Sequence, residues 1–218
     1  MKKVCYFFAI CLTSILAISC TSTPKVRDVS GNVEILEHRG SAWGVPIPEW
    51  VPKAMGTPNQ AELKKVLGID KHIWVFDNQG KNLDFLQNWV DQVNARAEIA
   101  ASIEQGVGDS VKAQLHGKSD EDVKKSLDRY SERAEMVMIA GLNKETEWWS
   151  RTRTRLDKKS DYEIKYQYFV VYSLDEQLYK EQIERAFSGF DDENGVIGNK
   201  IVEDLFNLTK IIRRPNDE

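Results

Sequence analysis

The stretch YEIKYQYFVVY, residues 162–172, decides the fold because its polarity alternates with a period of two residues. The second face of this stretch begins with the charged Glu163 and Lys165 and becomes apolar at Phe169 and Val171. This pattern is typical of a β-strand that is half exposed at its start and buried on both faces at its end. The first face carries Tyr162, Ile164, Tyr166, Tyr168, Val170 and Tyr172.

Residues 145–156 are the expected antiparallel partner of this strand, joined to it through the polar segment 157–161. Arginines alternate along the partner at positions 151, 153 and 155. We interpret this row as a solvated strand face with Glu163 available across it, and an anion site is the alternative. We expect Trp148 on the face of Tyr166 and Val170, because a one-residue slip would place the arginines among Tyr162, Ile164 and Tyr166.

Apolar residues at intervals of three and four predict amphipathic helices in the rest of the chain. A short apolar run at 72–76 predicts a buried strand, closed by a turn at 77–80. We expect an α+β fold, a small antiparallel sheet packed against several amphipathic helices in a single domain, with helices 83–105 and 175–187 on one face. The predicted helices cover 60–67 (ended by Gly68), 83–105 (capped by Asn82), 119–142, 175–187 (opened by a capping box, Ser173 to Glu176) and 199–212.

The segment 40–58 is rich in proline, which fixes φ and excludes a helix. It also carries Trp43 and Trp50. We expect an extended segment held in place by the packing of both indole rings, since tryptophan is highly buried on average. The alternative is an exposed aromatic platform that binds a ligand.

The N-terminus has the pattern of an export signal. Two lysines precede the uncharged apolar stretch 4–18, which is too short for a membrane span of about 20 residues. Cys20 follows the small residue Ser19, and polar residues begin directly afterwards. The sequence Leu16 to Cys20 resembles a lipobox, the cleavage site of bacterial lipoproteins, although Ala17 stands where the pattern prefers a branched aliphatic residue.

The cysteines support acylation of Cys20. Cys5 and Cys11 lie within the apolar stretch and would be removed with it, which leaves Cys20 as the only cysteine of the mature chain. A lone thiol cannot form an internal disulfide, so its presence in an exported protein requires another explanation. Lipidation of Cys20 provides one, and Thr21 in place of aspartate at the next position favours the outer over the inner membrane.

The expected organisation is a lipoprotein signal peptide at 1–19, an acylated cysteine and polar tether at 20–39, and a single periplasmic domain at 40–218. Without the two lysines of the signal, 28 basic residues face 34 acidic ones, a net charge of −6. This balance argues against nucleic acid as a partner, because its binders cluster Lys and Arg. The link to the membrane is therefore expected to be the lipid anchor at Cys20.

No catalytic, cofactor-binding or metal-binding residue is predicted. No two of His38, His72 and His116 stand at the spacing of metal ligands. The acidic run 191–195 fails the calcium-loop pattern, because Phe190 occupies the position that requires an acid. The Gly-Lys-Ser at 117–119 lacks the upstream glycine of a phosphate-binding loop. We therefore do not expect an enzyme.

Several short motifs together resemble the LPP-twenty-like family of bacterial lipoproteins. These are Pro-x-Trp at 48–50, Ala-Arg-Ala-Glu-Ile-Ala at 95–100, and a tryptophan followed by the aromatic strand 166–172. The resemblance covers about residues 40–187. It implies an envelope lipoprotein, in some members associated with outer-membrane or flagellar structures, and it transfers no catalytic residue.

These observations favour a membrane-anchored envelope lipoprotein with a structural or protein-interaction role and a partner in the envelope. The alternative is a periplasmic small-ligand binder or an enzyme without a recognisable motif. A binder needs a concave pocket of roughly 300 Å³ or more with converging polar groups. An interaction protein should instead show an exposed apolar patch or an open strand edge.

Replacing Cys20 with serine should abolish acylation and leave the precursor uncleaved by the lipoprotein peptidase. Stable attachment requires more than one acyl chain, and each chain contributes about 0.8 kcal/mol per buried CH₂. Serine has no thiol and cannot form the thioether that carries these chains. Fatty-acid labelling of cells and detergent partitioning measure this. An unlabelled, aqueous wild-type protein that behaves as Cys20→Ser does would contradict the lipoprotein interpretation.

Overall fold

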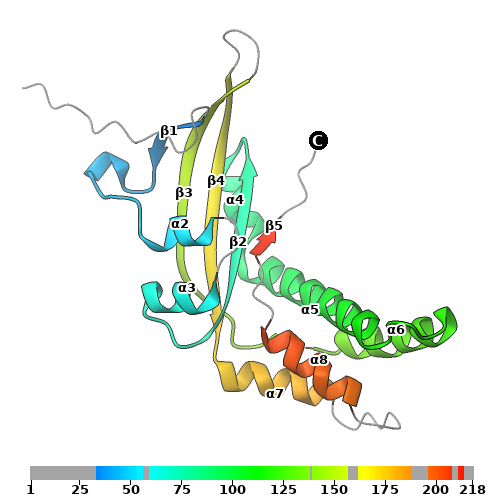
Figure 1. Cartoon of the computed structure of the whole chain (residues 1–218). Helices are drawn as coiled ribbons and strands as arrows, with labels where there is room; N and C mark the ends of the chain where they lie inside the picture. The colour runs from blue at the N-terminus through cyan, green and yellow to red at the C-terminus, as the bar shows by residue number, and fades with distance from the viewer. Residues whose placement is uncertain are drawn as a thin grey trace, which may run out of the picture.

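The computed structural model describes residues 33–55, 59–137, 139–156, 162–187, 196–207 and 211–213. Within them, five strands form one sheet in the order β1-β3-β4-β2-β5, and helices cover both of its faces (Figure 1). All neighbouring strands are antiparallel except β2 and β5, which are parallel. The expected α+β fold in a single domain is confirmed.

The longest pairing joins β3 (Asn143–Arg155) to β4 (Tyr162–Leu174), as the alternation in the sequence predicted. On its other side β4 pairs with β2 (His72–Gly80). The turn expected at 77–80 is wrong, because these residues continue the ladder opposite Phe169 to Tyr166. The Gln167 side-chain amide donates to the Asp77 carboxylate at 3.1 Å, so this buried acidic residue of β2 has a partner inside the sheet.

The polar tether expected over 20–39 is wrong at its end, where β1 (Val33–His38) pairs with the outer edge of β3. These residues form a strand because apolar and charged side chains alternate. Ile35 is buried against the sheet, and Glu34 and Glu37 point to the other face. The folded unit therefore includes β1 and begins no later than Val33.

The register expected between β3 and β4 is also wrong. Trp148 lies opposite Phe169, and Arg153 lies opposite Ile164, so the arginines do share a face with Ile164 and its tyrosine neighbours. Two interactions make this register favourable. Trp148 gains a fully buried place beside Phe169, and the arginines find carboxylates on β1, a strand that the sequence did not reveal.

The helix expected over 83–105 is divided into α4 (Leu83–Trp89) and α5 (Gln92–Gln114). Asn82 caps α4 as predicted, since its side-chain oxygen accepts the Phe85 amide hydrogen at 3.0 Å. The division follows from two polar contacts at the junction. The Tyr172 hydroxyl donates to the Val90 carbonyl at 2.6 Å, and the Asp91 carboxylate accepts the Asn94 amide hydrogen at 2.9 Å, which caps a new helix.

Three other helix predictions change at their ends. α6 (Asp120–Ala134) begins after Ser119 as expected but stops well before Leu142. α7 (Glu176–Phe187) is capped by Asp175, whose carboxylate accepts the Leu178 amide hydrogen, while Ser173 belongs to β4. α8 (Val196–Asn207) is followed by β5 (Ile211–Arg213), so the last part of the expected helix 199–212 is a strand beside β2.

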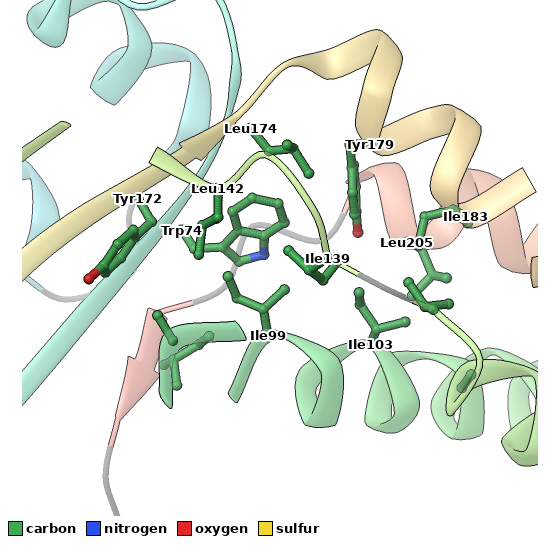
Figure 2. Close-up of a cluster of buried hydrophobic side chains, with 14 of the residues drawn as sticks. Trp74, Ile99, Ile103, Ile139, Leu142, Tyr172, Leu174, Tyr179, Ile183 and Leu205 are labelled. Carbon is green, nitrogen blue, oxygen red and sulfur yellow. The ribbon is translucent and has the colours of Figure 1, made fainter. Parts of the chain in front are cut away.

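The main core lies between the sheet and the layer formed by α4, α5, α7 and α8, so the two helical segments expected on one face do share it. Figure 2 shows Trp74 of β2 at its centre, between Ile99 of α5 and Leu142. Tyr179 of α7 packs edge-on against the Trp74 ring, with centroids 5.2 Å apart. Side chains of α5, α7 and the segment before β3 thus enclose one tryptophan.

A smaller apolar cluster covers the opposite face of the sheet. There α2 (Trp50–Ala54) and α3 (Gln60–Leu67) pack on Val75, Trp148 and Phe169. Gly68 ends α3 with a φ of 67°, as its position in the sequence predicted. Burial of Trp50 confirms that this indole holds the proline-rich segment to the sheet. The extended conformation expected over 40–58 is wrong at α2, because Pro52 lies in the first turn of this helix, where proline is tolerated.

Ile99→Ala should lower the free energy of unfolding by about 2–5 kcal/mol, because Ile99 is fully buried in the main core and its truncation leaves a cavity. Ile164→Ala is the matched control, since Ile164 is 42 % exposed and should cost less than about 1 kcal/mol. Chemical denaturation of both variants measures the difference. Equal losses would contradict the placement of the core.

Candidate functional site

A groove beside β3 is a concave feature of the described part of the chain. β1 leaves β3 at the pair His38–Ser150, and beyond it no strand in the described ranges pairs with the outer side of Asn143–Trp148. The segment 39–48 turns away from the sheet there and encloses a cavity of about 530 Å³. Its lining consists of Arg39, Gly40, Val45, Pro48, Lys144, Glu145, Thr146, Glu147 and Trp148.

The outer wall of the groove, the Trp43 loop (residues 40–48), owes its shape to two glycines. A short 3-10 helix, η1 (Ser41–Trp43), is flanked by Gly40 and Gly44 with φ of 87° and 70°, a conformation that other residues rarely adopt. The amide hydrogens of Trp43 and Val45 both bind the Gly40 carbonyl, at 3.0 and 3.1 Å. The loop is therefore a compact turn with internal hydrogen bonds.

Trp43 does not pack as the sequence led us to expect. Its side chain is 87 % exposed at the tip of the loop, whereas Trp50 is 6 % exposed. The prediction of structural packing is thus confirmed for Trp50 and wrong for Trp43. The difference arises because η1 projects away from the sheet, while Trp50 starts a helix that lies on it.

Glu147 is the centre of the charged cluster on the groove floor. Its carboxylate pairs with Arg39 at 2.8 Å and with Lys144, and it accepts the Tyr168 hydroxyl at 2.6 Å. Burial alone would raise the pKa of Glu147, but the hydrogen bonds from Lys144 and Tyr168 and the positive charges of Lys144 and Arg39 lower it below its usual value. The carboxylate is therefore ionised at neutral pH.

Tyr168 is a hydrogen-bond donor in this cluster and is not poised to ionise. Burial, followed by the adjacent Glu147 carboxylate, raises the pKa of Tyr168 well above its usual range. Its hydroxyl thus remains protonated and fixes the position of the carboxylate. A catalytic acid needs the opposite, a pKa near the working pH.

Glu145 forms a second ion pair at the end of the groove. Its carboxylate lies 2.8 Å from Lys71 and accepts a hydrogen bond from the Ser173 hydroxyl. The hydrogen bond from Lys71, followed by that from Ser173, lowers the pKa of Glu145. Both carboxylates of the groove are thus satisfied by neighbouring cations, which leaves the floor close to neutral.

Backbone and indole groups give the groove its remaining polarity. The Arg39 guanidinium donates to the Glu147 carbonyl at 2.9 Å, in the place where a neighbouring strand would donate. The indole N–H of Trp148 is buried without a hydrogen-bond partner. Val45 and Pro48 add an apolar wall opposite this edge. This arrangement suits an extended chain better than a reacting group.

The arginine row lies on the sheet above the groove, and carboxylates of β1 pair with it. Arg151 lies 3.3 Å from Glu37, and the Arg153 Nε donates to Glu34 at 3.0 Å. The partners are thus residues of β1, and the expectation that Glu163 would serve is wrong because Glu163 points to the other face beside Thr154. Arg153 also lies over the Tyr162 ring, 4.8 Å from its centroid. These pairings weaken the anion-site alternative.

The three histidines lie on different elements, His38 at the end of β1, His72 at the start of β2 and His116 after α5. His72 stacks on Tyr179 and packs edge-on against Trp74, with ring centroids 4.4 Å apart in both pairs. Burial, followed by the charge of Lys64, lowers the pKa of His72 to about 4. His72 is neutral at physiological pH. Across the described ranges, no group of three or more His, Cys, Asp or Glu side chains could hold a metal ion.

Cys20, the predicted lipidation site, lies outside the described residues. No protein-family model, curated protein or solved structure shows significant similarity to this chain.

The stability of the domain should fall as the pH drops below about 4.5, the ordinary pKa of a glutamate, because Glu147 and Glu145 have lowered pKa values in the folded state. Such groups stabilise the fold while ionised, and this contribution is lost as the pH falls through their folded pKa. Glu147→Gln should therefore lose less stability than wild type on acidification, as measured by chemical denaturation at several pH values.

The matched control for this measurement is Glu184→Gln, an exposed residue of α7 in an i,i+4 pair with Lys180. It should keep the wild-type pH dependence, since exposed pairs contribute little. An identical acid dependence in wild type and Glu147→Gln would show that the cluster does not stabilise the folded state.

Proposed function

We propose that this chain is a lipid-anchored envelope lipoprotein, attached through Cys20 and located at the outer membrane, whose domain binds another envelope protein. The anchor rests on the apolar stretch 4–18 and on Cys20, the only cysteine that would remain after cleavage. Among the helices of the described ranges, none is long and apolar enough to cross a membrane. An acyl anchor needs no such helix.

The open edge of β3 supports the interaction role more than any other feature. An unpaired strand edge offers main-chain donors and acceptors to an extended segment of a partner, which adds to the sheet as a further strand. Within the described ranges no strand pairs with the outer side of Asn143–Trp148, and the groove beside it has room for an extended chain. Glu147 already uses its carbonyl to accept a side-chain donor from Arg39.

The charges in the groove fit binding better than catalysis. Glu147 and Glu145 each have cationic partners, and both have lowered pKa values. A general acid would need a raised pKa, and a general base needs a carboxylate that is not already committed to ion pairs. The resemblance to the LPP-twenty-like lipoproteins is consistent with this role and suggests an outer-membrane or flagellar-associated assembly.

A small-ligand binder is the second candidate, and the cavity of about 530 Å³ favours it. This volume exceeds the roughly 300 Å³ that a ligand pocket needs. A small ligand would find main-chain groups of the β3 edge, since the charged side chains Lys144 and Glu147 pair with each other.

A photoreactive amino acid at position 144 should crosslink to an envelope protein in intact cells, because the Lys144 side chain lines the groove. The additional substitution Val45→Arg should remove the adduct, since it fills the groove with a long charged side chain at a half-exposed position. Phe85→Arg on α4, also half exposed, is the matched control and should keep the adduct. Mass spectrometry of the adduct identifies the partner.

Two results would contradict the proposed interaction role. The first is the absence of any adduct at position 144. The second is an adduct that persists in Val45→Arg, because the partner would then contact the protein outside the groove.

A further inference from the structure

We infer that the Trp43 loop contacts the lipid surface that carries the anchor, with the Trp43 indole in the headgroup region of the bilayer. The inference rests on the proposed anchoring through Cys20. It explains why a large aromatic side chain is 87 % exposed on a domain whose other large aromatic residues are mostly buried. Tryptophan is enriched at membrane–water interfaces, where its apolar ring and polar N–H both find suitable surroundings.

The composition of the loop fits a lipid surface. Residues 40–48, GSAWGVPIP, contain no charged side chain, in a chain of which 29 % is charged. Trp43 and Val45 are its exposed large hydrophobic residues, at 87 % and 50 %. Inserting a charged loop would require desolvation of its charges, and this loop avoids that cost.

The loop is also built to hold Trp43 outward. Gly40 and Gly44 adopt positive φ on either side of η1, and the Gly40 carbonyl accepts hydrogen bonds from Trp43 and Val45. A side chain at position 40 would bring its Cβ within 2.9 Å of the Val45 Cβ. A turn that is already ordered loses little conformational entropy when its tip enters an interface.

The length of chain before the domain places the loop within reach of the membrane. Twelve residues separate Cys20 from Val33, and this stretch spans at most about 45 Å when extended. β1 then adds six residues, or roughly 20 Å, before the loop begins. Among the described residues, the loop is the first exposed apolar turn after Cys20, which favours the anchoring bilayer over a second protein as its occupant.

Lipids brominated in the acyl chain near the headgroup quench tryptophan emission at short range and test the inference. The full acylated chain would be reconstituted in phosphatidylethanolamine–phosphatidylglycerol vesicles with and without these lipids. We expect quenching of the wild-type emission, and loss of most of that quenching in Trp43→Ser. Trp149→Phe removes a partly buried indole on the sheet and should leave the quenching unchanged.

The controls separate this inference from the proposed anchor. Vesicle flotation and fatty-acid labelling report on Cys20 alone, and both should be the same for wild type and Trp43→Ser. A chain that is acylated and floats, yet shows equal quenching in wild type and Trp43→Ser, overturns the contact and leaves the anchor intact. A chain without an acyl group overturns the anchor, and with it the membrane contact.

Discussion

The pairing of Trp148 with Phe169 in the ladder between β3 and β4 determines what each layer of the domain contacts. It directs both rings to the face covered by α2 and α3. The alternate residues of β4, including Tyr172, must then face the helices on the other side. Because side chains alternate with a strict period of two, a shift of one residue would exchange the contents of both cores. The two apolar clusters are thus fixed by one register.

The same register creates the charged surface beyond the cores. It places Arg151 and Arg153 on the same face of the sheet as the main core, beyond the part that the helices cover. Tyr166 and Ile164 lie opposite them in the ladder. β1 resolves this arrangement by supplying Glu37 and Glu34. Each exposed pair is worth at most about 1 kcal/mol, so the pairs select the partner strand more than they stabilise the fold.

Local signals in the sequence predicted local structure well. The alternation at 162–172 predicted β4, Gly68 marked the end of α3, and Asn82 marked the start of α4. The errors concern contacts between distant segments. The register depends on β1, more than a hundred residues before β3, and the break after α4 depends on the Tyr172 hydroxyl reaching the Val90 carbonyl. The exposure of Trp43 could have been suspected from the glycines on either side of it.

The Trp43 loop lies apart from the main core of the domain. None of residues 40–48 is buried, and the main core is formed by the helical layer on the other face of the sheet. Substitutions at the exposed positions of the loop should therefore change binding without unfolding the protein, because they remove almost no buried apolar surface. The exceptions are Gly40 and Gly44, whose positive φ makes the shape of the loop depend on glycine. A surface of this kind can change its partner while the sheet and its cores stay the same.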